Sequence, residues 1–309
     1  MINDDAQTRP LFNKIALIGV GLIGGSFALS LKKARAVEHV VGLDRHSTSL
    51  KAALQLGIID SFTDDMASAI ADADLIVIAT PVAQTTKILS SIYPYLQSNT
   101  IVTDVGSTKA DVVLAARTSL QEKVSQFIPA HPIAGREKNG PEAAIDDLYV
   151  GKKVVITLLA ENADQSIELV AQAWRLCGAI IHHLSPKEHD QVFASVSHLP
   201  HLLAYALVDD IAAKPHADRL FQYAASGFRD FTRIAGSSPE MWRDISLANR
   251  TAILEELDSY SAKLQQLRAS LEASDSVALE AIYSRAQTAR VNWITAIEAA
   301  ESQNKDGGD

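Results

Sequence analysis

The stretch Lys14–Ser26, KIALIGVGLIGGS, joins a short apolar run to a set of glycines and then to a helical pattern. Gly19 can take the tight turn from strand to helix, Gly21 lets the backbone approach a pyrophosphate, and Gly24 lets the helix pack closely on the strand. Backbone amides at the start of the helix would then hold the anion. The stretch therefore predicts the phosphate-binding turn of a dinucleotide fold. Its predicted cofactor-binding residues are Gly19, Gly21, Leu22, Ile23 and Gly24.

An acidic residue follows the next predicted strand at the position that a dinucleotide fold requires. The strand is expected at Val40–Leu43 and ends at Asp44, twenty residues after Gly24, where a carboxylate binds the cofactor ribose. Capping of the next helix is the alternative role for Asp44. Arg45 could bind a 2′-phosphate, but the neighbouring carboxylate would repel one. NAD is therefore favoured over NADP as the cofactor.

Length and composition restrict the class of protein. The chain has 309 residues, of which 47% are hydrophobic and 21% charged, enough for two globular domains. A net charge of −9 argues against nucleic acid or an anionic membrane as a partner. The lone Cys177 excludes an intramolecular disulfide and a thiolate-cluster metal site. With a polar N-terminus and no uninterrupted apolar run of membrane length, the protein is predicted to be cytoplasmic.

Strand and helix signals alternate as far as residue 185, which predicts a mostly parallel, doubly wound sheet in a domain over 1–185. One strand is followed directly by Thr80 and Pro81, at the sheet edge where ligands bind, although a plain helix start explains these residues equally well. The further strands are expected at Leu75–Ala79, Ile101–Asp104, Gln126–Ala130, Lys152–Leu158 and Ala179–His182.

Residues 186–309 carry helical periodicity and are predicted to form an all-α domain. Apolar positions recur at spacings of three and four from Val192 to Leu207, and Pro200 should kink that helix. A later series has a heptad-like spacing, which favours a homodimer through the C-terminal helices, with packing inside one chain as the alternative. We call this series the C-terminal seam: Ile253, Leu257, Tyr260, Leu264, Leu267 and Leu271.

His131 is the strongest candidate for a catalytic residue. It follows a predicted strand at the cofactor edge of the sheet, and a neutral imidazole can accept a proton near neutral pH. Ser107 lies on the preceding loop of the same crevice. Its hydroxyl could hydrogen-bond the imidazole or the nicotinamide, or it could cap a helix that begins near Thr108.

Polar residues in the helical half are candidates for substrate binding. His198 and His201 are three residues apart, too few ligands for a metal site, and they could instead donate hydrogen bonds to a substrate. Arg229 and Arg233 suit carboxylate recognition, with a surface ion pair as the alternative for Arg229 and burial expected for Arg233. For Trp242, core packing is the plain alternative.

The sequence resembles the prephenate dehydrogenase family of tyrosine biosynthesis over nearly its full length, including its cyclohexadienyl and arogenate dehydrogenases. This resemblance implies an N-terminal Rossmann domain, a helical dimerisation domain, and NAD-dependent oxidative decarboxylation of prephenate to 4-hydroxyphenylpyruvate. The motifs that carry it are GVGLIGGS at 19–26, DVGSTK at 104–109, HPIAGREKNG at 131–140, SHLPH at 197–201 and GFRDFTRIAGSSPEMW at 227–242.

The resemblance also implies roles for single residues. His131 would be the partner of the ring hydroxyl, with Ser107 as its orienting neighbour, while Arg233 would bind a carboxylate and His201 would contact substrate. Trp242 would lie near the active site across the dimer, so the site would depend on assembly.

Two positions near the presumed substrate side chain leave the substrate preference open: Arg136 stands where many relatives carry Thr, and Arg229 stands where many carry Lys. Glu137 is a candidate polar gate or substrate contact. An enzyme that prefers arogenate is therefore an alternative to one that prefers prephenate. We expect neither a fused chorismate mutase nor a C-terminal regulatory domain, from the positions of the first strand and the last helix.

Two other classes of protein share parts of this pattern. A β-hydroxyacid dehydrogenase also combines a glycine-rich domain with a helical one, but it normally uses a lysine as base, whereas the candidate here is His131. A nicotinamide-sensing regulator would need a DNA-binding module or a basic face, and neither is visible in the sequence.

Overall fold

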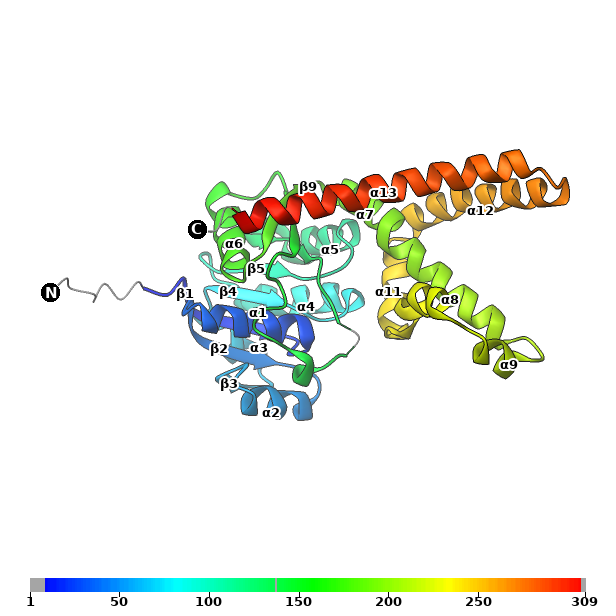
Figure 1. Cartoon of the computed structure of the whole chain (residues 1–309). Coiled ribbons are helices and arrows are strands. Elements are labelled where there is room, and N and C mark those ends of the chain that lie inside the picture. Colours follow the sequence, from blue (N-terminus) through cyan, green and yellow to red (C-terminus); the bar gives the residue numbers. More distant parts are fainter. Residues whose placement is uncertain (1–8, 137, 307–309) are drawn as a thin grey trace. The chain divides into compact units, whose positions relative to one another are not determined.

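The computed structural model describes residues 9–136 and 138–306 (Figure 1). Contacts divide the chain into two compact units, with the division between Ile253 and Leu254. The domain boundary that we predicted after residue 185 lies inside the first unit. There the last described strand ends at Leu184, and only helices follow it among the described residues.

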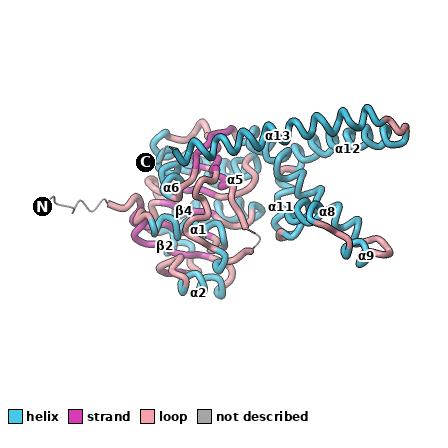
Figure 2. The backbone as a smooth tube through the Cα atoms, viewed as in Figure 1, coloured by secondary structure: helices cyan, strands magenta, loops and turns pink. Residues whose placement is uncertain are grey.

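A parallel sheet forms the centre of the first unit, as predicted, and its strands are magenta in Figure 2. The sheet has six strands. Its order, β3-β2-β1-β4-β5-β6, is that of the Rossmann dinucleotide fold. Only β3, two residues long, was absent from the sequence prediction, because so short a strand has no periodic signal. The strands are β1 (Phe12–Ile18), β2 (Val37–Leu43), β3 (Ser61–Phe62), β4 (Leu75–Ile78), β5 (Ile101–Asp104) and β6 (Phe127–Ile128).

Helices cover both faces of this sheet, because side chains alternate between the faces along each strand. On β1, Ile15 and Leu17 join a core with α1, α2 and α6, whereas Ala16 and Ile18 join a second core with α3, α4 and α5. The helices are α1 (Leu22–Lys33), α2 (Ser47–Gln55), α3 (Met66–Ile70), α4 (Thr85–Ile92), α5 (Ala110–Leu120) and α6 (Asp164–Leu176).

The strand predicted at Gln126–Ala130 divides at Pro129, and the chain then enters a second sheet. Proline has no N–H to continue a ladder, while its carbonyl accepts a hydrogen bond from the Thr157 amide at 2.9 Å. His131 consequently lies inside a strand of the second sheet, opposite Val155, and not beyond the end of a strand. The second sheet has the order β7 (Ala130–Pro132), β8 (Lys153–Thr157) and β9 (Ile180–Leu184), with β7 antiparallel to β8.

The three glycines of the β1–α1 turn have separate roles. Gly19 has a φ of +98°, and a Cβ there would lie 2.5 Å from the carbonyl oxygen of Ala79. A Cβ on Gly24 would lie 2.5 Å from the Gly19 carbonyl oxygen and 2.7 Å from the Ala79 Cβ. A Cβ on Gly21 would meet nothing within 4 Å. Gly19 and Gly24 therefore allow the turn and the close helix packing, while the space beside Gly21 is open to a ligand.

The helix predicted over Val192–Leu207 is part of a longer, interrupted helix. Its first segment begins at Ser185, where Ser185 and Glu188 form a capping box. A π-helical turn, Ala194–His198, separates the two α-helical segments and lies directly before the predicted kink at Pro200. The helices of this region are α7 (Pro186–Phe193), α8 (Leu199–Ala212), α9 (Ala217–Gln222), α10 (Ser226–Thr232) and α11 (Pro239–Ala248).

By length and composition alone, the stretch Pro186–Ala212 could cross a membrane, although the sequence analysis identified no such run. Its polar residues make contacts inside the first unit that a lipid-facing helix does not make. Asp190 accepts hydrogen bonds from two backbone amides of α5 and its preceding residue, and the Asp190 carbonyl accepts one from Asn249. These contacts identify the stretch as a packed helix of the first unit.

The second unit consists of the greater part of α12 (Arg250–Glu272) together with α13 (Ser276–Asp306). Within this chain half of the C-terminal seam on α12 is exposed: Tyr260 is 36% exposed, Leu264 48% and Leu271 62%, whereas Ile253 is buried. Burying such side chains against another apolar surface is favourable. The seam is therefore available for packing against a second subunit.

Replacing Gly24 by alanine should destabilise the fold by about 1–3 kcal/mol, the usual cost of overpacking a core, because the new Cβ would clash with the carbonyl oxygen of Gly19 and the Cβ of Ala79. Gly21→Ala is the matched control, and its stability should stay within about 0.5 kcal/mol of the parent. Urea denaturation at one fixed protein concentration measures both. Equal stability of the two variants would contradict the packing role of Gly24.

Candidate functional site

A first cavity of about 580 Å³ lies at the carboxyl ends of β1, β2 and β4. Leu22, Ile23 and Gly24 do not line it but form the first turn of α1, whose N-terminus has no side-chain cap and no acidic residue. The amides of that turn are therefore available to an anion. The predicted cofactor residues on its wall are Gly19, Gly21, Asp44, Arg45, Thr80 and Pro81.

Two polar groups on the wall of the first cavity indicate how it could bind a ligand. Asp44 accepts hydrogen bonds from the amides of His46 at 2.9 Å and Val20 at 3.3 Å, which fix its carboxylate at the end of β2. The N-cap of α2 is His46, so the alternative prediction that Asp44 caps the next helix is wrong. The buried hydroxyl of Thr80 has no hydrogen-bond partner among the described residues. A ligand in this cavity could supply that partner.

A second cavity, of about 450 Å³, brings residues of β7 together with residues of α8, α11 and the segment between α10 and α11. Residues 131–136 line the second cavity and residues 139–141 line the first, so one segment connects the two. Glu137, a predicted substrate contact, lies outside the described residues. The predicted site residues on the wall of the second cavity are His131, Arg136, His201, Arg233 and Trp242.

The wall of the second cavity is cationic. Arg136 and Arg233 both line it, and no aspartate or glutamate does so among the described residues. Arg233 is exposed, not buried as the sequence suggested, because it lies in a short 3₁₀ segment, Arg233–Gly236, at the surface. A guanidinium group can bind a carboxylate through two parallel hydrogen bonds, so these two side chains suit a ligand that carries carboxylates.

His201 and Trp242 form a stacked pair on this wall. Their ring centroids are 3.6 Å apart with the rings inclined by 20°. His201 Nδ1 lies 2.8 Å from the carbonyl oxygen of Ser197, and burial together with the positive charge of Arg233 lowers its pKa. We expected Trp242 to approach the site across a dimer, but the chain's own Trp242 occupies this position, 9% exposed and on the cavity wall.

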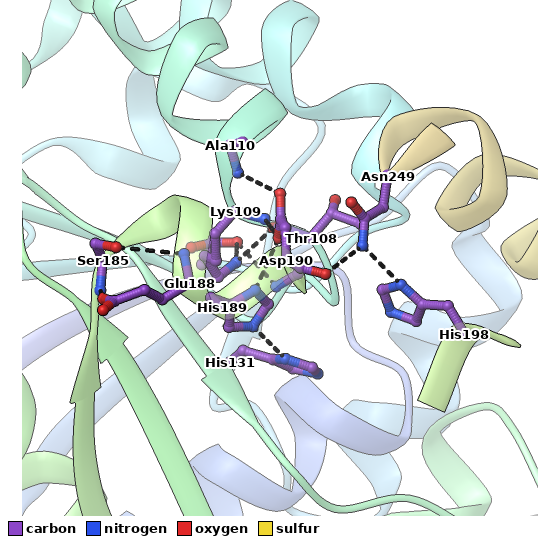
Figure 3. A network of polar contacts seen from close by, with 12 residues as sticks. Thr108, Lys109, Ala110, His131, Ser185, Glu188, His189, Asp190, His198 and Asn249 are labelled. Carbon is purple, nitrogen blue, oxygen red and sulfur yellow. Dashed lines mark hydrogen bonds and ion pairs between the residues drawn. The ribbon is translucent and has the colours of Figure 1, made fainter. Parts of the chain in front are cut away.

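His131 faces the second cavity from β7 and contacts a second histidine behind it (Figure 3). Its Nδ1 lies 2.8 Å from Nε2 of His189, and the ring of Phe193 packs edge-on at a centroid distance of 4.9 Å. Burial lowers the pKa of His131 well below its usual value, and the positive charge of Lys109 lowers it further. The imidazole is therefore neutral at physiological pH and able to accept a proton.

Asp190 lies behind His189 and caps α5 from a distant part of the chain. Its carboxylate is 2.8 Å from His189 Nδ1, and it accepts hydrogen bonds from the amides of Lys109 at 2.8 Å and Ala110 at 2.9 Å. Since α5 begins at Ala110, the prediction that Ser107 caps a helix beginning near Thr108 is wrong. Ser107 lines neither cavity in the structure.

His198 and Arg229 lie away from the cavity walls. His198 is 2% exposed, and its Nδ1 is 3.0 Å from the side-chain nitrogen of Asn249. It also hydrogen-bonds the backbone of Ser107, while burial lowers its pKa to about 4. His198 thus supports the loop after β5. Arg229 is exposed and lines neither cavity, so a direct substrate contact for either residue has no support in this geometry.

A buried ion pair fixes the loop that precedes α5. Lys109 Nζ lies 2.7 Å from an Asp104 oxygen, and the two side chains are 0% and 3% exposed. Asp104 also accepts hydrogen bonds from the amides of Gly106 at 2.8 Å and Ala130 at 3.1 Å. The pair therefore ties the end of β5 to the residue before His131.

The residues behind His131 could not be identified from the sequence. A local signal for one pair exists: the capping box at Ser185 and Glu188 predicts a helix in which His189 and Phe193, four residues apart, share a face. Nothing local shows that this face packs on β7. The residues missed in this way are Asp104, Lys109, His189, Asp190 and Asn249.

No group of three or more histidine, cysteine or acidic side chains suited to a metal ion occurs among the described residues.

Two family models match the chain. The prephenate dehydrogenase nucleotide-binding domain matches residues 27–183, and the prephenate dehydrogenase dimerization domain matches residues 185–284. The chain is 35% identical to the cyclohexadienyl dehydrogenase of Zymomonas mobilis over 284 residues, which cover 91% of this chain and 96% of the relative. It is 38% identical to the prephenate dehydrogenase of Bacillus subtilis over 266 residues, covering 84% and 71% respectively.

Solved structures are similar over the same extent. Prephenate dehydrogenase from Aquifex aeolicus, solved with hydroxyphenyl propionate and NAD+, is 35% identical with a TM-score of 0.85, covering 91% of this chain and 98% of that one. Synechocystis arogenate dehydrogenase is 28% identical with a TM-score of 0.76, covering 91% and 99%.

Lys109→Met should destabilise the protein by about 3–5 kcal/mol, because it leaves the buried Asp104 carboxylate without its cation. Lys33→Met, which removes an exposed pair with Asp146, is the matched control and should cost no more than about 1 kcal/mol. Urea denaturation measures the difference, and adding Asp104→Asn to Lys109→Met should recover part of the loss. Similar costs for the two single variants would argue against the structural role of the buried pair.

Proposed function

Since the chain belongs to the prephenate dehydrogenase family, we propose that it catalyses the NAD-dependent oxidative decarboxylation of prephenate to 4-hydroxyphenylpyruvate. The observation that carries this proposal is a pair of cavities, the first lined by residues 139–141 and the second by residues 131–136. The first has the wall of a dinucleotide site, and the second presents a neutral histidine among cationic side chains.

The residues of the first cavity fit NAD. Open space beside Gly21 and the uncapped first turn of α1 suit the pyrophosphate, because backbone amides there are free to donate. Asp44 suits the ribose hydroxyls and disfavours a 2′-phosphate. The unpartnered hydroxyl of Thr80 gives a further contact for the cofactor. When bound, NAD supplies the acceptor for a hydride.

The charge of the second cavity fits prephenate, which carries two carboxylates and no cation. Arg136 and Arg233 can each bind a carboxylate, and His201 lies on the same wall. Arogenate carries the same two carboxylates and an additional ammonium group, so the arginines suit both compounds. Steady-state assays with each compound measure the preference.

In the proposed mechanism His131 accepts the proton of the ring hydroxyl while a hydride leaves the same carbon. The bond between the ring and its carboxylate then breaks, carbon dioxide leaves, and the electron pair enters the ring. The oxygen recovers its proton from His131, which returns to the neutral form. The chain's own contribution is the base, the cations for the carboxylates, and the alignment of the two cavities.

The buried lysine argues against the rival β-hydroxyacid dehydrogenase mechanism. Lys109 is 0% exposed, bonded to Asp104, and lines neither cavity. No lysine among the described residues lines the second cavity, so a lysine base has no support there.

We infer that the enzyme is a homodimer formed through its C-terminal helices. The exposed half of the C-terminal seam and the match to a dimerization domain support this inference.

His131→Asn should lower kcat by at least about 100-fold, the usual scale for the loss of a general base, while the Kd for NAD stays near that of the parent. The asparagine keeps a polar side chain of similar reach, so the fold should be retained. Steady-state kinetics with prephenate and a titration with NAD measure the two effects. Turnover close to that of the parent would exclude His131 as the base.

Asp44→Ser should shift the cofactor preference toward NADP, because it removes the charge that repels a 2′-phosphate beside Arg45. The ratio of kcat/KM for the two cofactors is the measurement. Ser49→Ala, a change on the same wall without a change of charge, is the control and should leave the ratio unaltered. An unchanged ratio in the Asp44 variant would contradict its role in cofactor selection.

A further inference from the structure

A hydrogen-bond chain runs from α7 to the base that faces the second cavity (Figure 3). Asp190 contacts Nδ1 of His189 at 2.8 Å, and Nε2 of His189 contacts Nδ1 of His131 at 2.8 Å. Each contact needs one donor and one acceptor, so the proton positions in the two rings depend on each other.

The protonation state of Asp190 decides which atom donates in each of these hydrogen bonds. Burial opposes ionisation of Asp190, but hydrogen bonds from His189 and from the amides of Ala110 and Lys109 outweigh it and lower its pKa. An ionised carboxylate can only accept hydrogen bonds. Nδ1 of His189 therefore carries a proton and donates it to Asp190.

His189 itself stays neutral. Its side chain is 0% exposed, and burial lowers its pKa; the positive charge of Lys109 lowers it too, against the opposing effect of Asp190. In a neutral imidazole whose Nδ1 carries the proton, Nε2 has a lone pair and accepts. The donor in the contact with His131 must then be Nδ1 of His131.

The proton on Nδ1 of His131 leaves Nε2 as the basic atom of the site. With its proton on Nδ1, neutral His131 has its lone pair on Nε2, the ring nitrogen left for the cavity that the ring lines. We propose that His189 and Asp190 are positioning residues that hold His131 in the Nδ1-protonated tautomer, so that Nε2 is the atom that accepts the substrate proton. This proposal rests on the proposed role of His131 as the base.

Packing makes this arrangement rigid. Phe193 contacts the rings of both histidines, at centroid distances of 4.9 Å for His131 and 4.5 Å for His189. Asp190 is anchored separately by the amides at the start of α5, so its position does not depend on His189. A triad with the same logic loses most of its activity when its histidine is held in the wrong tautomer.

Two substitutions at His189 separate tautomer control from simple packing. His189→Gln can place its amide oxygen near the former Nε2 and accept the Nδ1 proton of His131. His189→Leu fills similar space but offers no acceptor, so the proton of His131 should move to Nε2, where the cavity provides partners. The leucine variant should lose about 100-fold in kcat, and the glutamine variant should stay within about tenfold of the parent.

Binding measurements show whether either variant has simply lost its structure. The KM for prephenate and the Kd for NAD should stay within about threefold of the parent in both variants, because neither cavity is lined by His189. A leucine variant with kcat close to that of the parent would overturn the proposal. A glutamine variant that falls as far as the leucine variant would also overturn it.

A direct measurement on the parent enzyme does not depend on the variants folding. The nitrogen NMR spectrum of protein labelled with ¹⁵N-histidine, with His131 assigned by its loss in His131→Asn, should show Nδ1 protonated and Nε2 unprotonated at neutral pH. The opposite tautomer would overturn the proposal. Absence of prephenate turnover in the parent would instead count against the proposed function, while the tautomer would still be measured.

Discussion

A charge buried in protein must be paired, and the centre of this site is arranged around that requirement. Lys109 and Asp104 pair at 2.7 Å in a region closed to solvent, and Asp104 also holds the amide of Ala130, directly before His131. Asp190 accepts hydrogen bonds from the amides of Lys109 and Ala110, at the end of the same loop. The loop after β5 therefore joins the parallel sheet, the second sheet and α7 at one point. The positive charge kept there also helps to hold His131 neutral.

The two cavities are built from different sheets. The first is built from the carboxyl ends of parallel strands, where a Rossmann sheet offers backbone amides and loops. The second needs β7, which exists because the chain leaves the parallel sheet at Pro129 and pairs with β8 instead. That change of sheet turns His131 toward α7 and α8. Residues 131–136 border the second cavity and residues 139–141 border the first, so neighbouring parts of one loop contribute to both walls.

The parts predicted well from the sequence depend on local spacing. The glycine spacing and Asp44 identify the phosphate-binding turn and its acidic residue, and continuous apolar runs identify the strands. Each of these signals involves residues that are close together in the sequence. The support behind His131 could not be predicted in this way: it joins residues 58 and 81 positions apart. The exposure of Arg233, the chain's own Trp242 on the wall and the support role of His198 likewise depend on how distant helices pack.

The π-helical turn at Ala194–His198 gives this packing its register. An α-helix turns by roughly 100° per residue, so positions 189 and 201, twelve residues apart, would face directions roughly 120° apart on an uninterrupted helix. A π turn accommodates one additional residue, which brings the separation close to eleven residues and the two directions to within roughly 20°. His189 behind the base and His201 on the cavity wall can thus serve one site from one continuous helix. A regular α-helix with one residue fewer has the same offset of roughly 20° between the two positions, so deleting a single residue from this turn would keep the two histidines on one face.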